Sequence, residues 1–396
     1  MTAGPLDGAL VLELGQVYNG PYCGMLLHHL GAEVVKIEPP DGDPIRAHPR
    51  GGERESHAFL LLNGGKRGVR IDLKSRSGSA LFLRLAEQAD VVIESFAPGT
   101  LERLGIGWDR LAEVNPRLVL ASGRGFAPGG PQGEWEAMDL TVQAMTGLMS
   151  ATGYPDGPPL QCGPAVTDFL GGVHLATAVL AALLERERTG AGQHVEVAMQ
   201  DAALPSLASH LAAQLDGDGS LPERTGNRHS AMGICPYDLY AARDGWVAIL
   251  CLTTSQWTAL CGAMNRDDVG EDPTLWSLAA RLARSVEIDE MIGAWSRRRP
   301  RADAVAQLQR AGVPCAPVAS IREVLEDEQL RRVGMLQRIE SRGGTFAFGS
   351  PLRGSRLPRR APAAAPVLGE HTDAVLSERL GLDEDELDEL RRAHVL

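Results

Sequence analysis

The sequence predicts an α/β fold in which a doubly wound parallel sheet forms a large domain and a smaller α+β domain follows it. Two observations carry this prediction. Short apolar strands alternate with helical segments between residues 10 and 122, and a hairpin followed by several helical segments occupies residues 237–311. At 396 residues the chain is also too long for one ordinary core, so two domains are expected.

The first strand–helix–strand unit lies at the N-terminus. Residues 10–14 form a short apolar strand, and after Gly15 and the turn-prone segment 19–21 a helical pattern runs to Leu30. A glycine then precedes residues 33–38 (EVVKIE), which are typical of a second strand. Together these segments indicate a βαβ unit with a parallel sheet.

The same alternation continues along the first third of the chain. Helices are expected over residues 77–88 and 108–114, and strands over 90–94 and 117–122. Because each strand is separated from the next by a helix, the strands are expected to run parallel.

The middle of the chain is mostly helical. A helix is expected over 137–150, and a long apolar helix from Asp168 to about Arg188 precedes the stop signal of 189–192. Residues 196–210 begin as a strand and become helical.

A polar, turn-rich linker at 215–230 introduces the second domain. Strands 237–242 and 246–250 are expected to pair as a β-hairpin, and helical patterns fill most of 255–311. The tail from Gly369 to the C-terminus is also helical in pattern.

Composition limits the classes of function. The net charge of −12 argues against nucleic acid and anionic membrane surfaces as partners. Six scattered cysteines form no CxxC pair, so neither a zinc site nor a disulfide framework is indicated, and no metal is expected. We see no signal peptide and no apolar run near the ~20 residues that span a bilayer, so a cytoplasmic protein is expected.

Asp168 is the residue that most affects the functional interpretation. It lies in the expected first turn of the long helix, near Gly171 and Gly172, which leave room for a close neighbour. Helix N-termini favour ionised carboxylates, so Asp168 is expected to be ionised and can serve as a nucleophile. Physical chemistry alone favours a helix cap by about 3:1, and Asp139 has the same alternative as a helix start.

A basic segment stands out on this acidic chain. Its residues are Lys66, Arg67, Arg70, Lys74 and Arg76, with Arg46 before them and Arg103 after them. Such a cluster can hold phosphates through charge-assisted hydrogen bonds, although composition alone favours a solvated loop face.

Short sequence blocks along nearly the whole chain, in order, carry a resemblance. They are Gly20-Pro21, 30–38 (LGAEVVKIE), Gly42-Asp43, 63–67 (NGGKR), 72–74 (DLK), 89–96 (ADVVIESF), 104–106 (LGI), 115–117 (NPR), 143–147 (QAMTG), 189–193 (TGAGQ), Asp244-Gly245, 312–315 (GVPC) and 368–372 (LGEHT). With these blocks the chain resembles the family III CoA-transferases, a group that includes formyl-CoA transferase, the carnitine-dehydratase-related enzymes and α-methylacyl-CoA racemase.

The resemblance implies an architecture and a set of partners. It implies a large Rossmann-like CoA-binding domain from residues 1–214, to which 331–396 return as C-terminal helices, and a small α+β domain of 225–330. It further implies an interlocked homodimer that acts on acyl-CoA and carboxylic acids. CoA would be substrate and carrier, with no tightly bound cofactor.

The resemblance also implies roles for particular residues. The catalytic aspartate falls on Asp168 and the assisting acidic residue on Asp139. The CoA contacts fall on Val17, Ile71, Asp72, Leu73, Lys74, Phe96, Arg103, Leu104 and Met199, with Lys74 and Arg103 facing the nucleotide end. Residues expected around the acyl group are Tyr18, Gly171, Gly172 and His229.

Some positions depart from the family pattern. Tyr18 replaces a glutamine, Ser95 an asparagine and Pro39 an arginine, which argues against formyl-CoA and oxalate as the substrates. Racemase members have a histidine where this chain has Met138, so the second acid–base group that racemisation needs is missing.

The sequence therefore predicts CoA transfer between carboxylic acids through an aspartyl-CoA thioester. The alternatives are an acyl-CoA racemase or epimerase of the same family and a non-catalytic acyl-CoA-binding protein. The acyl donor and the acceptor acid stay open.

Overall fold

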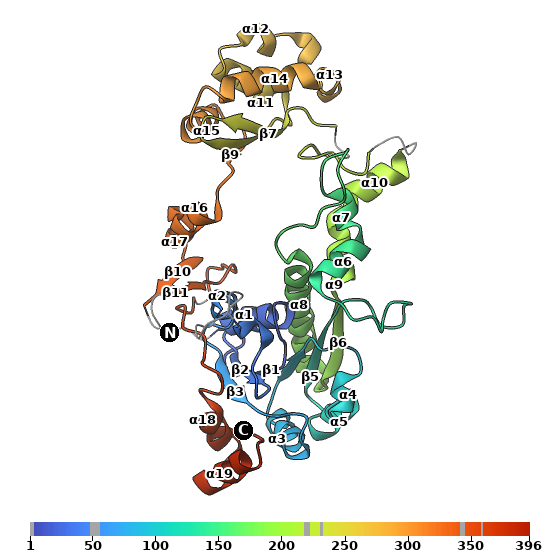
Figure 1. Cartoon of the computed structure of the whole chain (residues 1–396), viewed down its shortest axis with the longest axis vertical. Helices are drawn as coiled ribbons and strands as arrows, with labels where there is room; N and C mark the ends of the chain where they lie inside the picture. The colour runs from blue at the N-terminus through green and yellow to red at the C-terminus, as the bar shows by residue number, and fades with distance from the viewer. Residues whose placement is uncertain (1–3, 48–55, 218–221, 230–232, 341–344, 358) are drawn as a thin grey trace. The chain divides into compact units, whose positions relative to one another are not determined.

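The computed structural model describes residues 4–47, 56–217, 222–229, 233–340, 345–357 and 359–396. The chain forms two compact units, whose elements are labelled in Figure 1. Unit 1 comprises Met1–Thr146, Gly163–Pro205 and Asp327–Leu396, and unit 2 comprises Gly147–Cys162 and Ser206–Glu326.

The boundaries of the units differ from the expected ones around residues 147–162. This segment was expected in the large domain, but hydrogen bonds join it to the segment around Arg224. The Ser150 hydroxyl donates to the Glu223 carboxylate at 2.8 Å, and the Arg224 guanidinium donates to the Ser150 carbonyl at 3.2 Å. Hydrogen bonds between segments about 70 residues apart in the sequence therefore place 147–162 in unit 2.

The centre of unit 1 is a six-stranded parallel sheet in the order β3-β2-β1-β4-β5-β6. Its strands are β1 (Leu10–Glu13), β2 (Glu33–Glu38), β3 (Arg67–Arg70), β4 (Val91–Glu94), β5 (Val119–Arg124) and β6 (Gln193–Ala198). This order is that of doubly wound dinucleotide-binding folds. The order in which successive strands are added to the sheet reverses between β1 and β4, although all strands run parallel. The predicted doubly wound parallel sheet is confirmed.

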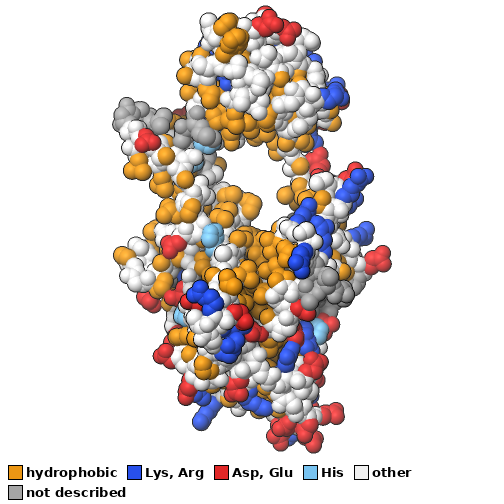
Figure 2. Space-filling model, turned by 180° about the vertical axis from the view of Figure 1, so that it is seen from behind, with side chains coloured by type: hydrophobic (Ala, Val, Ile, Leu, Met, Phe, Trp, Pro, Cys, Tyr) orange, Lys and Arg blue, Asp and Glu red, His pale blue; other side chains and the backbone are white. Residues whose placement is uncertain are grey.

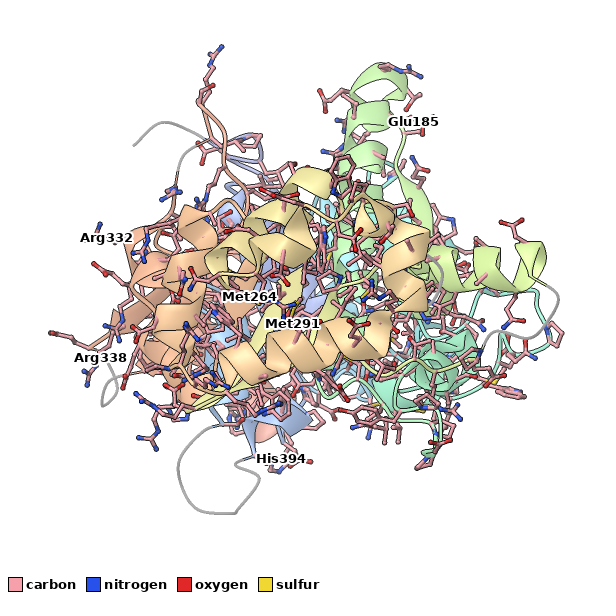
Figure 3. The ribbon with its side chains drawn as sticks, turned by 90° about the horizontal axis from the view of Figure 1, so that it is seen from above. Glu185, Met264, Met291, Arg332, Arg338 and His394 are labelled. Carbon is pink, nitrogen blue, oxygen red and sulfur yellow. The ribbon has the colours of Figure 1, made fainter. Side chains whose placement is uncertain are left out.

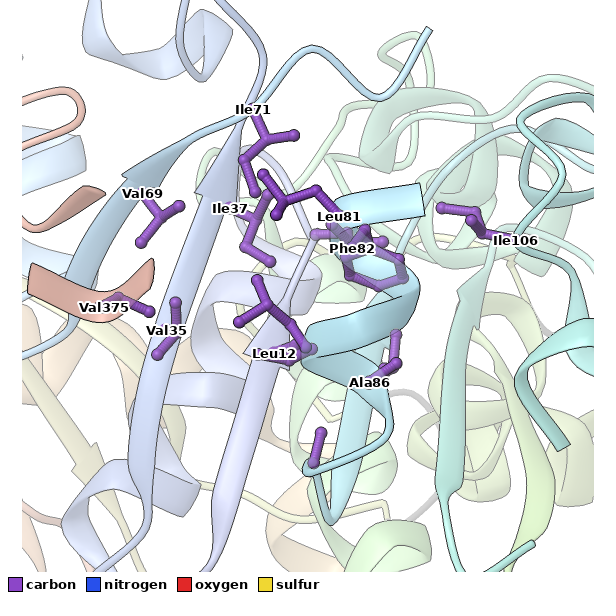
Figure 4. Packing of buried hydrophobic residues seen from close by; sticks show 14 of the residues in the cluster. Leu12, Val35, Ile37, Val69, Ile71, Leu81, Phe82, Ala86, Ile106 and Val375 are labelled. Carbon is purple, nitrogen blue, oxygen red and sulfur yellow. The ribbon is translucent and has the colours of Figure 1, made fainter. Parts of the chain in front are cut away.

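Helices cover both faces of this sheet because its strands are apolar on both sides. On one face Leu12, Val35 and Ile37 pack with α3 (Arg76–Ala86), α5 (Trp108–Val114), α18 (Thr372–Leu380) and α19 (Glu384–Arg392). Figure 4 shows part of this core, including Phe82 of α3.

The opposite face of the sheet packs against two helices. Val11, Val34 and Val91 alternate with the residues of the first core and contact α1 (Asn19–His29) and α8 (Val166–Thr189). The sheet thus separates two hydrophobic cores, and both α1 and α8 contribute side chains to the second core.

Helix α8 is the longest helix of unit 1 among the described residues. Its buried side chains recur at helical spacing, as in Leu175, Val179 and Ala182, and it ends at Gly190, whose φ of 74° allows its N–H to reach the Arg186 carbonyl at 2.8 Å. By length and composition it could span a membrane, which contradicts the expectation that no such run exists. Its packing against the sheet is that of a core helix.

Shorter elements complete unit 1. They are η1 (Pro44–Arg46), α2 (His57–Leu62), α4 (Thr100–Arg103), α6 (Asp139–Thr146), α9 (Met199–Ala203), α17 (Glu328–Arg332) and the antiparallel pair β10 (Leu336–Ile339) and β11 (Thr345–Phe348). Strand β3, helix α2 and the β10–β11 pair were not predicted from the sequence.

Unit 2 has its own sheet and core. Strands β7 (Tyr237–Ala242) and β8 (Gly245–Leu250) form the predicted hairpin, and β9 (Cys315–Pro317) joins them. Its helices are α7 (Leu148–Ala151), α10 (Ala208–Asp216), α11 (Thr254–Ala263), α12 (Asp267–Gly270), α13 (Leu278–Ala283), α14 (Ser285–Ser296), α15 (Arg301–Arg310) and α16 (Ile321–Glu326), with η2 (Leu204–Leu207) at the boundary of the units and η3 (Pro273–Leu275). Met264, labelled in Figure 3, belongs to its core, and Met291, labelled there too, is partly buried and packs against that core.

A cluster of four buried charged side chains, Glu13, Lys36, Asp43 and Lys66, lies near the N-terminal part of α1. The Lys66 ammonium contacts the Glu13 carboxylate at 2.7 Å, and the Lys36 ammonium contacts Glu13 at 3.3 Å and Asp43 at 3.0 Å. All four side chains are almost completely buried, and backbone carbonyls of Gly15 and other residues accept further hydrogen bonds. The positive and negative charges balance, which makes their burial possible.

The ion cluster leads to a prediction about stability. Glu13→Gln leaves two buried ammonium groups with Asp43 as their nearest remaining carboxylate, so the free energy of unfolding should fall by about 3–5 kcal/mol. Urea denaturation measures the change.

Glu113→Gln is the matched control, because Glu113 pairs with Arg110 on an exposed helix surface. That substitution should change the free energy of unfolding by less than about 1 kcal/mol. Equal stability of the Glu13→Gln variant and the unsubstituted protein would contradict the role given to the cluster.

Candidate active site

A cavity of about 510 Å³ opens at the carboxyl edge of the parallel sheet. Segments that follow β1, β4 and β5 line it, including Val17, Phe96 and Phe126, together with Asp168 of α8 and Met199 of α9. Ligands of doubly wound folds bind at this edge, where the strand order reverses. Here the reversal lies between β1 and β4, so the cavity occupies the expected place for a ligand.

Asp168 lies in the first turn of α8 and is 8% exposed. Among the described residues none donates a hydrogen bond to its carboxylate. Burial, and then the like charge of Asp139, raise the pKa of Asp168 to about 7. The helix N-terminus was expected to favour the ionised carboxylate, whereas burial and repulsion by Asp139 favour its protonated form.

Asp139 caps the N-terminus of α8, a role that the sequence analysis had considered for Asp168. Its carboxylate accepts hydrogen bonds from the Thr167 backbone N–H at 2.9 Å and from the Thr167 hydroxyl at 2.7 Å. The Gln143 side-chain amide donates to its other oxygen at 2.7 Å. Asp139, at the start of α6, thus caps α8 from outside, and Asp168 remains free of a capping role.

The two glycines of α8 allow α1 to approach. A Cβ atom on Gly171 would lie 2.3 Å from Asn19 Nδ2, and one on Gly172 would lie 2.7 Å from the Asn19 carbonyl oxygen. The room beside the glycines, expected to admit a ligand, is occupied by α1. Their observed role is helix packing, and neither lines the cavity.

Val17 has an unusual backbone conformation beside the cavity. Its φ is 64°, which is strained for a β-branched residue. The Val17 N–H donates to both oxygens of the Asp43 carboxylate at 3.3 Å, and Asp43 is held by Lys36. The buried ion cluster therefore supports the loop that borders the cavity.

Tyr18 contacts Phe169, the residue that follows Asp168 in α8. The rings of Tyr18 and Phe169 stack with centroids 5.8 Å apart, and Tyr22 meets the edge of the same ring at 5.0 Å. Tyr18 does not line the cavity, and its contact with an acyl group stays a prediction.

Six of the residues expected to contact CoA lie outside the cavity lining. They are Ile71, Asp72, Leu73 and Lys74 after β3, and Arg103 and Leu104 at the end of α4. Ile71 is fully buried in the core, while Lys74 and Arg103 are exposed. A long substrate would have to extend along the sheet edge to reach both groups.

The basic segment does not form one phosphate-binding surface. Lys66 is buried in the ion cluster, and Arg67 pairs with Glu33 and Glu378. The Arg46 guanidinium lies on the Phe59 ring at 3.7 Å. These three cations stabilise the fold, a role that neither alternative from the sequence anticipated. Lys74, Arg76 and Arg103 are exposed and remain candidates for phosphate binding.

His229 belongs to unit 2 and packs edge-on against Tyr237 with ring centroids 5.7 Å apart. Its role near an acyl group stays a prediction. In the described ranges, no group of three or more His, Cys, Asp and Glu side chains has an arrangement that could hold a metal ion.

Sequence reasoning missed several residues that line the cavity. Trp135 and Phe126 are among them, and their rings meet edge to face at 5.9 Å. Asn19 also lines it. The loop that carries Trp135 has no periodicity, so no local signal indicated these side chains.

Comparisons with known proteins agree with this geometry. A model of CoA-transferase family III matches residues 6–372. The formyl-CoA:oxalate CoA-transferase of Streptomyces coelicolor is 36% identical, with 100% of both chains covered. The succinyl-CoA:mesaconate CoA-transferase of Haloarcula hispanica is 38% identical, with 95% of this chain and 96% of that one covered.

Solved structures resemble the chain over nearly its full length. A CaiB/BaiF family protein from Brucella suis is 33% identical with a TM-score of 0.85, covering 96% of this chain and 100% of that one. A protein from Mycobacterium tuberculosis is 31% identical with a TM-score of 0.81, covering 94% and 99%. The chain therefore belongs to CoA-transferase family III and is an enzyme that transfers CoA between acyl-CoA thioesters and carboxylic acids.

Proposed function

We propose that Asp168 is the nucleophile of this transfer and carries CoA as an aspartyl thioester. The observation that supports it is the position of Asp168 on the cavity wall without a hydrogen-bond donor among the described residues. A carboxylate without such donors keeps its lone pairs available for attack, and a largely buried site makes the attack effectively unimolecular.

The reaction proceeds through two kinds of intermediate. An Asp168 oxygen attacks the acyl-CoA carbonyl, the carbon–sulfur bond breaks, and a mixed anhydride and CoA thiolate form. The thiolate then attacks the Asp168 carbonyl carbon, which releases the first acid as a carboxylate and leaves the aspartyl-CoA thioester.

The second acid reverses these steps. Its carboxylate attacks the thioester carbonyl and displaces CoA thiolate, which gives a new mixed anhydride. The thiolate attacks the acyl carbon of the new acid, so that a new acyl-CoA leaves and the Asp168 carboxylate is restored. No net proton is taken up or released.

Neighbouring residues serve this chemistry in the same proposal. Asp139 holds the first turn of α8 through Thr167 and tunes the pKa of Asp168. Val17, Phe96 and Met199 line the path of the pantetheine arm. Ile71, Asp72, Leu73 and Leu104 contact CoA, and Lys74 and Arg103 face its nucleotide end.

The substrates are proposed from the relatives. Their names include oxalate, mesaconate and glutarate as acids, so we expect a short dicarboxylic acid as acceptor. The departures at Tyr18, Pro39 and Ser95 argue against the formyl-CoA and oxalate pair. We place the enzyme in the cytoplasm, where CoA thioesters are formed and consumed.

The alternative functions are less well supported. Met138 lines the cavity at the position where a racemase would need a base, and its thioether cannot carry a proton at neutral pH. Exchange of α-hydrogen for deuterium in a 2-methylacyl-CoA without an acceptor acid would favour a racemase. Binding of CoA without transfer to any acid would favour a binding protein.

The first test of the mechanism is Asp168→Asn. Loss of the nucleophile should lower kcat by about 10⁴-fold or more and abolish the covalent CoA adduct seen by intact-protein mass spectrometry. Asp109→Asn is the matched control, because Asp109 is an exposed carboxylate in the first turn of α5. A fully active Asp168→Asn variant would refute the mechanism.

The second test is the pH dependence of kcat/KM. The ionised form of Asp168 attacks, so activity should rise with pH through an apparent pKa of about 7. Asp139→Asn removes the like charge and should move this limb to lower pH. A limb that stays in place in that variant would show that another group titrates.

The third test concerns the proposed homodimer. Val173, Leu180 and Leu184 form an exposed apolar stripe on α8, and Figure 2 shows hydrophobic side chains gathered on the side of the molecule where this helix lies. Such a surface indicates a protein interface. Light scattering should give twice the chain mass of 42.3 kDa.

Leu184→Glu should shift the protein toward the monomer, because it places a charge in the apolar stripe. Val286→Glu, at a similarly exposed position on α14 in unit 2, should leave the dimer intact. A monomer for the unsubstituted chain would refute the proposal.

A further inference from the structure

Asn19 is a buried polar residue that the mechanism above does not use. It is 5% exposed, and its Nδ2 and Oδ1 atoms are inaccessible and have no hydrogen-bond partner in the described part of the chain. An unpaired buried amide destabilises the fold, so proteins rarely retain one without a purpose. Asn19 also lines the cavity that contains Asp168.

Two glycines create the slot that holds this side chain. A Cβ atom on Gly123, in β5, would lie 2.5 Å from Asn19 Oδ1, and one on Gly171 would lie 2.3 Å from Nδ2. The amide is therefore clamped between the sheet and α8, with its donor end toward the helix. A clamped donor needs little reorganisation when a charge develops beside it.

The position of Gly171 relates the amide to Asp168. The two residues are three positions apart on α8, so they lie on the same face about one turn apart. The Asn19 amide makes no hydrogen bond with the carboxylate in this structure. Its donor therefore lies beside Gly171, about one helical turn from Asp168, and is unused.

Negative charge develops at this place during transfer. When CoA thiolate attacks the carbonyl carbon of the Asp168 anhydride, the oxyanion forms on an Asp168 oxygen, and it forms there again when the second acid attacks the thioester. The negative charge of Asp139 already repels a charge on Asp168. The oxyanion would therefore be stabilised by a hydrogen-bond donor and not by a further acceptor.

We propose that Asn19 is a catalytic residue whose Nδ2 donates a hydrogen bond to the oxyanion formed on Asp168. The inference rests on the proposed role of Asp168 as nucleophile. It assigns the stabilising donor to α1, whereas the first-turn backbone N–H of Thr167 is already bonded to Asp139. The close packing of α1 on α8 then has a chemical purpose.

The test compares three substitutions of Asn19. Asn19→Ala removes the donor and should lower kcat by about 10²–10³-fold while KM for acyl-CoA changes little. Asn19→Ser leaves a similar space but keeps a hydroxyl donor, so it should recover at least tenfold of the loss, on the order expected for a replaced donor. Asn19→Asp keeps the shape and removes the donor, so it should be as impaired as Asn19→Ala.

Single-turnover mass spectrometry provides the second measurement. The rate of covalent CoA adduct formation should fall in Asn19→Ala in parallel with kcat, and thermal unfolding should show that Asn19→Ala and Asn19→Ser are similarly folded. Equal losses in both variants would indicate a packing role and overturn the inference, as would an Asn19→Asp variant with full activity.

The same data separate this inference from the proposed function. If the unsubstituted enzyme forms no adduct on Asp168, the nucleophile itself is wrong. If the adduct forms at the same rate with and without the Asn19 amide, only the role of Asn19 is wrong.

Discussion

The close approach of α1 to α8 is the contact on which the active-site cavity depends. Gly171 and Gly172 bring the α8 backbone against Asn19, since a Cβ atom at either position would collide with it. A larger residue would push α8 outward and move Asp168 with it. The sheet packs against both helices, Asp139 caps the first turn of α8, and the Val17 loop immediately precedes α1. Helix packing therefore determines where the carboxylate can meet a substrate.

The treatment of buried polar groups differs between the fold and the site. Glu13, Lys36 and Lys66 satisfy one another within the ion cluster, so their charges are balanced. Asn19 and Asp168 are also buried. The Asn19 amide has no hydrogen-bond partner, and no residue in the described ranges donates a hydrogen bond to the Asp168 carboxylate. Their burial costs stability that the rest of unit 1 must offset, and unsatisfied groups of this kind are characteristic of functional sites. The raised pKa of Asp168 has the same origin.

Much of the fold could be predicted from local patterns. The observed bounds of β2, α5 and β7 coincide with the predicted ones, because each segment has clear periodicity between turn residues. Strand β3 was missed because its sequence, RGVR, has only one large apolar residue and was interpreted as part of a basic loop. The β10–β11 pair was missed because short antiparallel strands have little periodicity.

The candidate site was less accessible to sequence reasoning. By itself the sequence determined the parallel sheet, the long helix from its apolar spacing, and, through the family resemblance, the enzyme class and the position of Asp168. Tertiary structure alone decided that Asp139 caps α8, that Lys66 is a core ion, and that the room beside Gly171 belongs to Asn19. Periodicity records which face of a segment is buried, but hydrogen bonds and charge pairs between distant segments depend on the packed arrangement of the chain.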